Sequence, residues 1–297
     1  MLRLTPMLLM LAAFGLAAPA AAYAGEREVP KMTTFGGSCP KCELSGRRLR
    51  GAHFLGADFS GSSFVGSDLR DAHFLASKFV EANLTRADLT DSQILGANFT
   101  GANLSNARLN DAQASGSIFT TANLSGADLT DTAAQGSSFN EATLVKTKFQ
   151  DADLTLANMT RAIARGADFR DATMRGTTLA WGRFEKADFR DAVLDMANLT
   201  GGSFEGADFH DATLHHAQIG GADLSHARGL TQDQLNDACG DARTRLPSGL
   251  SVPKACTGNF HVMVRIPHVT VPGIPTPPAP PAPPNPPRYL VNVEASR

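Results

Sequence analysis

Three copies of an acidic hexapeptide, ADFRDA or ADFHDA, begin at Ala167, Ala187 and Ala207, and each places two carboxylates three positions apart. The pairs are Asp168 with Asp171, Asp188 with Asp191, and Asp208 with Asp211. Paired carboxylates serve in glycoside hydrolysis, and carboxylate oxygens are preferred ligands of Ca²⁺. Two chemistries are therefore candidates at these pairs, hydrolysis and cation binding.

The regular spacing of the copies extends beyond these pairs and forms two long series. The second Asp of each pair ends an unbroken series of eight: Asp71, Asp91, Asp111, Asp131, Asp151, Asp171, Asp191 and Asp211. The first Asp belongs to a series that Arg108 and Lys148 interrupt: Asp68, Asp88, Asp128, Asp168, Asp188 and Asp208. A glycosidase needs two carboxyls in unlike environments flanking one cleft. Eight equivalent copies do not provide that, and we expect neither an enzyme nor a cofactor.

Three roles remain for the Asp residues. As turn residues they would bond their own backbone and keep the surface soluble, which is the simplest interpretation. As weak metal ligands, the candidates are Asp151, Asp171, Asp191 and Asp211. As a contact surface for a basic partner, the six paired Asp residues would act together with Trp181, the only tryptophan. Trp181 is expected at an outward corner, stacked on the Arg161 guanidinium or free as a contact residue.

The elements that position these residues follow from a second period, of five. Every fifth residue from Leu49 to Leu224 gives 36 positions with 15 Leu, 14 Phe, 2 Ile, 2 Met and 3 Ala. The residue two places earlier is Ala in 24 of the 36 cases. Neither a helix nor a strand has this period. It fits a coil with four five-residue sides, in which the large residue and the Ala point inward and every fourth pentapeptide completes one turn.

Segments such as ADLTD, ANLSG and ADFSG are close to A(D/N)LXX, and over residues 44–224 the chain resembles the pentapeptide-repeat proteins. The resemblance implies an all-β fold, a right-handed quadrilateral β-helix of about nine coils. With coils stacked at the strand spacing of ~4.8 Å, the β-helix would be ~43 Å long. We assign residues 44–228 to it.

The remaining segments differ in composition. Residues 1–24 have the basic start, apolar run and small–x–small end of a signal peptide, which predicts export and cleavage after Ala24. Residues 25–43 would form the N-terminal segment and cap. Residues 229–260 would cap the C-terminus with a short helix, Gln232 to Cys239, started by a Thr231–Gln234 capping box. Residues 261–297 are a Pro-rich tail without predicted folded structure.

The four cysteines lie in two groups, one at each end of the repeats. A ~43 Å β-helix keeps the groups apart, which leaves Cys39–Cys42 and Cys239–Cys256 as the expected disulfides. Free thiols, a metal shared between chains, and a redox role for Cys39-Pro-Lys-Cys42 are the alternatives. Disulfides persist outside the cytoplasm, in agreement with a periplasmic or secreted protein.

The composition limits the partners. The net charge is −2, so nothing favours direct nucleic-acid binding. A retained membrane anchor is the alternative to cleavage at residues 1–24, although the apolar run is short for a span and is interrupted by Gly15 and Pro19; no other segment could cross a membrane. We expect an exported, non-enzymatic scaffold for an unidentified protein or envelope component, with the C-terminal cap as the surface for any homodimer. The family resemblance adds an alternative, a DNA mimic that binds gyrase, for which the excess of six acidic residues over residues 44–224 is small. Weak calcium binding along the Asp series is the other alternative.

Overall fold

The computed structural model describes residues 38–255. The chain divides into two compact units, Met1–Phe260 and His261–Arg297, and all described residues belong to the first. The predicted signal peptide, residues 25–37, Cys256 and the Pro-rich tail lie outside the described residues. None of the described helices is long and apolar enough to cross a membrane.

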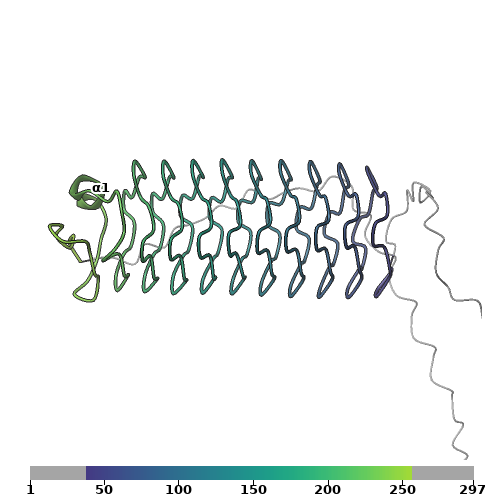
Figure 1. Ribbon diagram of the computed structural model, residues 1–297, viewed down its shortest axis with the longest axis horizontal. Coiled ribbons are helices and arrows are strands. Elements are labelled where there is room, and N and C mark those ends of the chain that lie inside the picture. Colours follow the sequence, from purple (N-terminus) through teal and green to yellow (C-terminus); the bar gives the residue numbers. More distant parts are fainter. Residues whose placement is uncertain (1–37, 256–297) are drawn as a thin grey trace, which may run out of the picture. The chain divides into compact units, whose positions relative to one another are not determined.

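The described chain winds into stacked coils of four pentapeptides each (Figure 1). The coils are joined by isolated parallel bridges, and from Ser38 to Arg228 each bridge links a residue to its equivalent one coil later, as in Arg108 with Asp128. Around such a bridge, the amide of Leu109 donates to the Asp128 carbonyl (2.7 Å) and that of Asp128 to the Ala107 carbonyl (3.0 Å). The predicted coil of four pentapeptides is confirmed, and the β-helix is its consequence.

Each coil turns a corner once in every pentapeptide. At one such corner the amide of Ala72 donates to the Leu69 carbonyl (3.1 Å), and Asp71 between them has a φ of 56°. Among the described residues, 22 non-glycine residues have positive φ, and the eight residues of the Asp series are among them. Asp, Asn and Gly adopt this left-handed conformation most readily. The left-handed conformation at the corner therefore favours Asp, Asn or Gly as the last residue of a pentapeptide.

The core is one continuous column of inward side chains. The predicted inward residues, Leu or Phe and the small residue two places earlier, are buried throughout the inner coils. Phenylalanines stack on each other from coil to coil, with ring centroids 4.8 Å apart for Phe79 and Phe99 and 5.0 Å apart for Phe99 and Phe119. Ser and Thr that replace the small Ala are buried too, and most donate to the backbone, as Thr132 Oγ1 does to the Leu109 carbonyl (2.7 Å).

The C-terminal end is closed by the short helix α1, Gln232–Asn236, and by additional parallel bridges that follow it. The predicted capping box of Thr231 and Gln234 is confirmed, and Leu235 is buried. The predicted helix end at Cys239 is wrong, because Cys239 returns to the ladder and pairs with Gln218. The segment after it also joins the ladder, since Arg245 pairs with Asp223 and Ala255 with Gly240.

The ladder also begins earlier than predicted. Ser38 pairs with Asp58 and Glu43 with Ser63, so the first coil includes residues assigned to an N-terminal cap. Cys39 occupies the phase of the large inward residue and Cys42 that of the small one. Their disulfide spans one corner of this coil, with the Cα atoms 5.5 Å apart.

Candidate functional site: the outward columns

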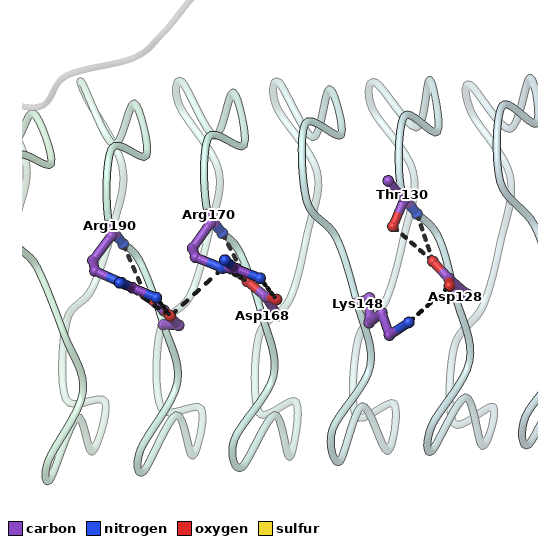
Figure 2. A network of polar contacts seen from close by, with 7 residues as sticks. Asp128, Thr130, Lys148, Asp168, Arg170 and Arg190 are labelled. Atoms are coloured by element: carbon purple, nitrogen blue, oxygen red, sulfur yellow. Dashed lines mark hydrogen bonds and ion pairs between the residues drawn. The ribbon is translucent and has the colours of Figure 1, made fainter.

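One side of the coils carries most of the ion pairs. We call it the ionic face: the side whose inward residues run from Leu49 to Phe209, one in each coil. Arg170 Nη2 lies 2.7 Å from Asp168 Oδ2 in its own coil, and Arg170 Nε lies 3.7 Å from Asp188 Oδ2 in the next (Figure 2). Arg190 pairs with Asp188 at 2.6 Å. Arg170 therefore links two coils.

The same Asp residues bond their own backbone, as predicted for turn residues. Asp128 Oδ1 accepts from the amide of Thr130 (3.2 Å) and from its hydroxyl (2.7 Å), while Lys148 Nζ lies 3.0 Å from Oδ2 (Figure 2). In Asp68, the hydrogen bond from the Arg70 side chain is the main cause that lowers the pKa, and partial burial opposes it. Burial works to raise the pKa of Asp188, but the bonds from Arg190 outweigh it and the pKa is lowered. The carboxylates of the ionic face are therefore engaged in hydrogen bonds and ion pairs within the β-helix.

The eight corner Asp residues behave differently. Arg50 Nε pairs with Asp71 Oδ2 at 2.9 Å. The side chains of the other seven have no ion pair or hydrogen bond with any described residue, and all seven are exposed. We call these seven the corner column: Asp91, Asp111, Asp131, Asp151, Asp171, Asp191 and Asp211. The sequence interpretation gave both Asp series the same backbone-bonding role, whereas the corner column owes its place to the left-handed φ.

The paired spacing does not create a shared site. Asp168, Asp188 and Asp208 lie in the ladder of the ionic face, and Asp171, Asp191 and Asp211 lie at its corner. Within residues 38–255, no three His, Cys, Asp or Glu side chains are grouped so that they could hold a metal ion. The weak metal candidates Asp151, Asp171, Asp191 and Asp211 are thus a line of single carboxylates.

Trp181 is exposed at a corner, as predicted, with 59% of its surface accessible. The predicted stacking on Arg161 is wrong. A Cβ built on Gly201, one coil further on, would lie 2.4 Å from Trp181 Cε3, so the ring covers that glycine. Arg161 instead pairs with Glu141 at 3.6 Å. The sequence held the signal, because the coil after Trp181, like the coil after the bulky corner residue Leu156, has a glycine at the same position.

The cysteine pairs can be placed only in part. Cys39 is joined to Cys42. Cys239 is also disulfide-bonded, and its predicted partner Cys256 lies outside the described residues. No described cysteine is free.

The solved structures that the chain matches include three proteins, two of which are described as pentapeptide repeat proteins. HetL, involved in heterocyst differentiation regulation in Nostoc sp. strain PCC 7120, is 24% identical, with a TM-score of 0.40, over 75% of this chain and 94% of its own. QnrB1, a plasmid-mediated fluoroquinolone resistance protein, is 21% identical, with a TM-score of 0.44, over 69% and 94%. A protein of the Arabidopsis thaliana thylakoid lumen is 30% identical, with a TM-score of 0.34, over 42% and 81%.

Among curated protein sequences, none matches the chain significantly. Family models do match. The model described as pentapeptide repeats (8 copies) covers residues 41–74, 77–120, 122–161 and 152–191, and that described as pentapeptide repeats (9 copies) covers 184–228. Together the two models cover more than half of the sequence. The chain belongs to the pentapeptide-repeat family.

Proposed function

We propose that the protein is an exported, non-enzymatic scaffold whose right-handed quadrilateral β-helix presents the corner column to a basic protein or envelope component. The observation that carries this proposal is the state of the corner column: seven exposed carboxylates without a partner among the described residues, one in each successive coil. The left-handed φ explains why Asp suits these corners, but within the described residues the carboxylates themselves make no contact with the fold, unlike those of the ionic-face Asp residues. The signal peptide of the sequence and the expected disulfides support the exported location.

The charge arrangement favours a basic partner. Carboxylates repeating at the coil spacing of ~4.8 Å add their potentials along one edge of the molecule. Nearby arginines of the ionic face, such as Arg170 and Arg190, are occupied by Asp168 and Asp188. Cationic groups arriving from outside therefore meet an uncompensated line of negative charge.

The test starts from cell fractionation and N-terminal sequencing of the recovered protein. We expect it in the exported fraction with Gly25 as its first residue; recovery in the cytoplasm with the leader intact would contradict export. Partners are then recovered from the same fraction by affinity purification with the wild type and with a variant that carries Asp131→Asn, Asp151→Asn, Asp171→Asn and Asp191→Asn. Asn adopts the left-handed conformation as well as Asp does, so the coils are preserved.

The matched control is Glu81→Gln with Glu141→Gln. These acidic residues also sit at left-handed corners, with φ of 56° and 57°, but on a different edge. We expect the Asn variant to lose a salt-sensitive partner that the Gln variant retains. Equal recovery by all three proteins would exclude the corner column as the binding surface.

A further inference from the structure

Two histidine rings are stacked on the outside of the first two coils. His53 and His73 are equivalent residues of these coils and are joined by a parallel bridge. Their ring centroids lie 4.2 Å apart, with the ring planes tilted by 30°. His53 is exposed and His73 is partly buried. Two imidazole groups are therefore held side by side at the surface.

The ladder fixes the backbone of both residues. The amide of His73 donates to the Ala52 carbonyl (2.8 Å), and the amide of Phe54 donates to the His73 carbonyl (2.7 Å). On the inner side, the rings of Phe54 and Phe74 are stacked with their centroids 5.3 Å apart. Ligands carried by a rigid element need little ordering when an ion binds, so the position of this pair favours binding.

A third side chain orients one of the rings. The His73 ring is hydrogen-bonded to the side chain of Gln93, which is the equivalent residue of the third coil. Histidine ligands of metal ions commonly donate their second ring N–H to an oxygen atom in this way, which fixes the tautomer and the direction of the ring. His73 therefore has one ring nitrogen held by Gln93 and the other left for an ion.

The charges around the pair determine which kind of ion suits it. Asp71, at the corner before His73, acts on that ring electrostatically, but its carboxylate is paired with Arg50 at 2.9 Å. Ca²⁺ prefers several oxygen ligands, and it would find this carboxylate already paired. Two protonated rings so close together would repel each other, so the stack favours neutral imidazole, which is the form that binds metals. Imidazole nitrogen suits Zn²⁺, Cu²⁺ and Ni²⁺.

The separation of the rings is compatible with one ion shared by both. Zn²⁺ binds imidazole nitrogen at about 2.0–2.1 Å, which places two ligand atoms of a tetrahedral ion about 3.3 Å apart. The ring centroids are 4.2 Å apart, and the tilt of 30° brings the rings closer together along one edge than along the other. A rotation of the rings about their Cβ–Cγ bonds can then direct one nitrogen of each to the same ion.

We infer that His53 and His73 form a binding site for a divalent transition-metal ion, Zn²⁺ or Cu²⁺, in which Gln93 positions His73. Residues 38–255 contain no group of three or more His, Cys, Asp or Glu side chains that could hold a metal ion, so this ion would have two protein ligands and complete its coordination with water. It would join the first coil to the second. The inference goes beyond the scaffold role and does not involve the corner column, to which Asp71 does not belong.

Isothermal titration of the full-length protein with Zn²⁺ tests the site. The wild type is compared with His53→Gln and with His73→Gln. Glutamine fits this position of the ladder, because Gln93 and Gln113 occupy it in the next two coils. We expect each substitution to raise the Kd for Zn²⁺ by roughly tenfold or more, because chelation by two rings is lost. An excess of Mg²⁺ or Ca²⁺ should not displace the Zn²⁺.

The matched control is His215→Gln with His216→Gln, which removes two adjacent histidines near the other end of the ladder. This variant should retain the wild-type affinity of the His53–His73 site. The Asn variant of the corner column should retain it too.

Electron paramagnetic resonance of bound Cu²⁺ identifies the ligands. The wild type should show two nitrogen donors, and His53→Gln should not. Gln93→Met tests the positioning role, because it removes the hydrogen bond to His73 but keeps a side chain of similar size. It should raise the Kd for Zn²⁺ by roughly tenfold while the Cu²⁺ spectrum still shows two nitrogen donors.

Two results would overturn the inference. One is equal Zn²⁺ affinity for the wild type, His53→Gln and His73→Gln. The other is a Cu²⁺ spectrum of the wild type without two nitrogen donors, which needs no variant to fold. Neither result bears on whether the corner column binds a basic partner, so the two proposals fail separately.

Discussion

The buried hydroxyl of Ser117 donates a 2.6 Å hydrogen bond to the carbonyl of Ile94 in the preceding coil. The same bond, between a small inward residue and a carbonyl that also closes a turn, joins Thr132, Ser137, Thr147 and Thr177 to their preceding coils. Ser92 occupies an equivalent position, but its Oγ has no partner among the described residues. The inward hydroxyls therefore differ in their effect on stability. That of Ser117 contributes a hydrogen bond between coils, whereas that of Ser92 is buried without one.

Ser117→Ala should destabilise the protein by about 1 kcal/mol, because a buried hydrogen bond is lost. Ser92→Ala should be neutral or stabilising, because an unpaired hydroxyl leaves the core and the commonest residue of this position replaces it. Urea unfolding of the two variants measures the difference. A larger loss for Ser92→Ala than for Ser117→Ala would show that the hydroxyl bonds are not as described.

Gly201→Ala should cost more than Gly136→Ala. Both glycines have positive φ, 66° and 63°, so each substitution carries a conformational cost of about 1–2 kcal/mol. Only at Gly201 would the new Cβ also meet the Trp181 ring, at 2.4 Å, whereas nothing lies within 4 Å at Gly136. The excess should disappear when Trp181→Ala is added. Persistence of the excess in the double variant would mean that the ring is not its cause.

Phe99→Ala should destabilise the protein by about 3–5 kcal/mol, since the ring is fully buried between Phe79 and Phe119. Phe54→Ala in the first coil should cost clearly less. Its ring stacks on Phe74 from one side and is only partly buried. Thermal unfolding of both variants gives the comparison, and equal losses would indicate that the first coil is as well packed as the inner ones.

The C-terminal cap should loosen in acid. The hydrogen bond from the Arg243 side chain is the main cause that lowers the pKa of Asp241, to about 2 from an ordinary 3.8. Asp241 also accepts from the Gly221 amide at 2.9 Å, which ties the cap to the last coil. A group whose folded pKa is depressed stabilises the fold above its unfolded pKa and loses this contribution as the pH falls.

The loss should therefore occur between about pH 4 and pH 2. Amide hydrogen exchange of Gly221 and Arg243 measures it, after correction for the intrinsic pH dependence. Asp241→Asn removes the titrating carboxylate, so the protection of these amides should vary much less over this range. Identical pH profiles of the variant and the wild type would assign the loosening to other groups.

Non-reducing peptide mapping should recover Cys39 joined to Cys42 by a disulfide, and Cys239 joined to Cys256. In the first coil the disulfide crosses a corner between residues of the inward phase, so Cys39→Ser with Cys42→Ser should destabilise mainly that coil. Hydrogen exchange near Ser45 and near Thr120 separates local from global effects. Free thiols in the exported protein would contradict the pairing.

The sequence was most informative where one residue type must fill one place in every coil. The inward Leu, Phe and Ala repeat without a slip, so the coil of four pentapeptides and its core followed directly. The ends were less predictable, because the ladder continues there through residues outside the consensus, such as Cys39, Cys239 and Arg245. Cys39 was nonetheless in phase with Leu44, and extending the period by one pentapeptide would have placed it.

The outward residues were harder to interpret, for a physical reason. Position in the pentapeptide says which edge a side chain occupies but not which neighbour it contacts. Asp168 and Asp171 looked like a pair, yet one is held by Arg170 and the other has no partner among the described residues. Trp181 likewise had Arg161 and Gly201 at equal sequence distance, and the direction in which corner side chains lean decided for the glycine.

The unbroken five-residue phase also fixes the side of the coils on which each outward residue lies. Loss of four consecutive pentapeptides would shorten the molecule by one coil and leave every later residue on its own face. Loss of a single pentapeptide would keep the core pattern intact but rotate all later residues by a quarter turn. The corner column would then continue along another edge, and the ion pairs of the ionic face would be interrupted at that coil. The core pattern therefore tolerates the loss or gain of any whole pentapeptide. The surface pattern tolerates such a change only in multiples of four pentapeptides.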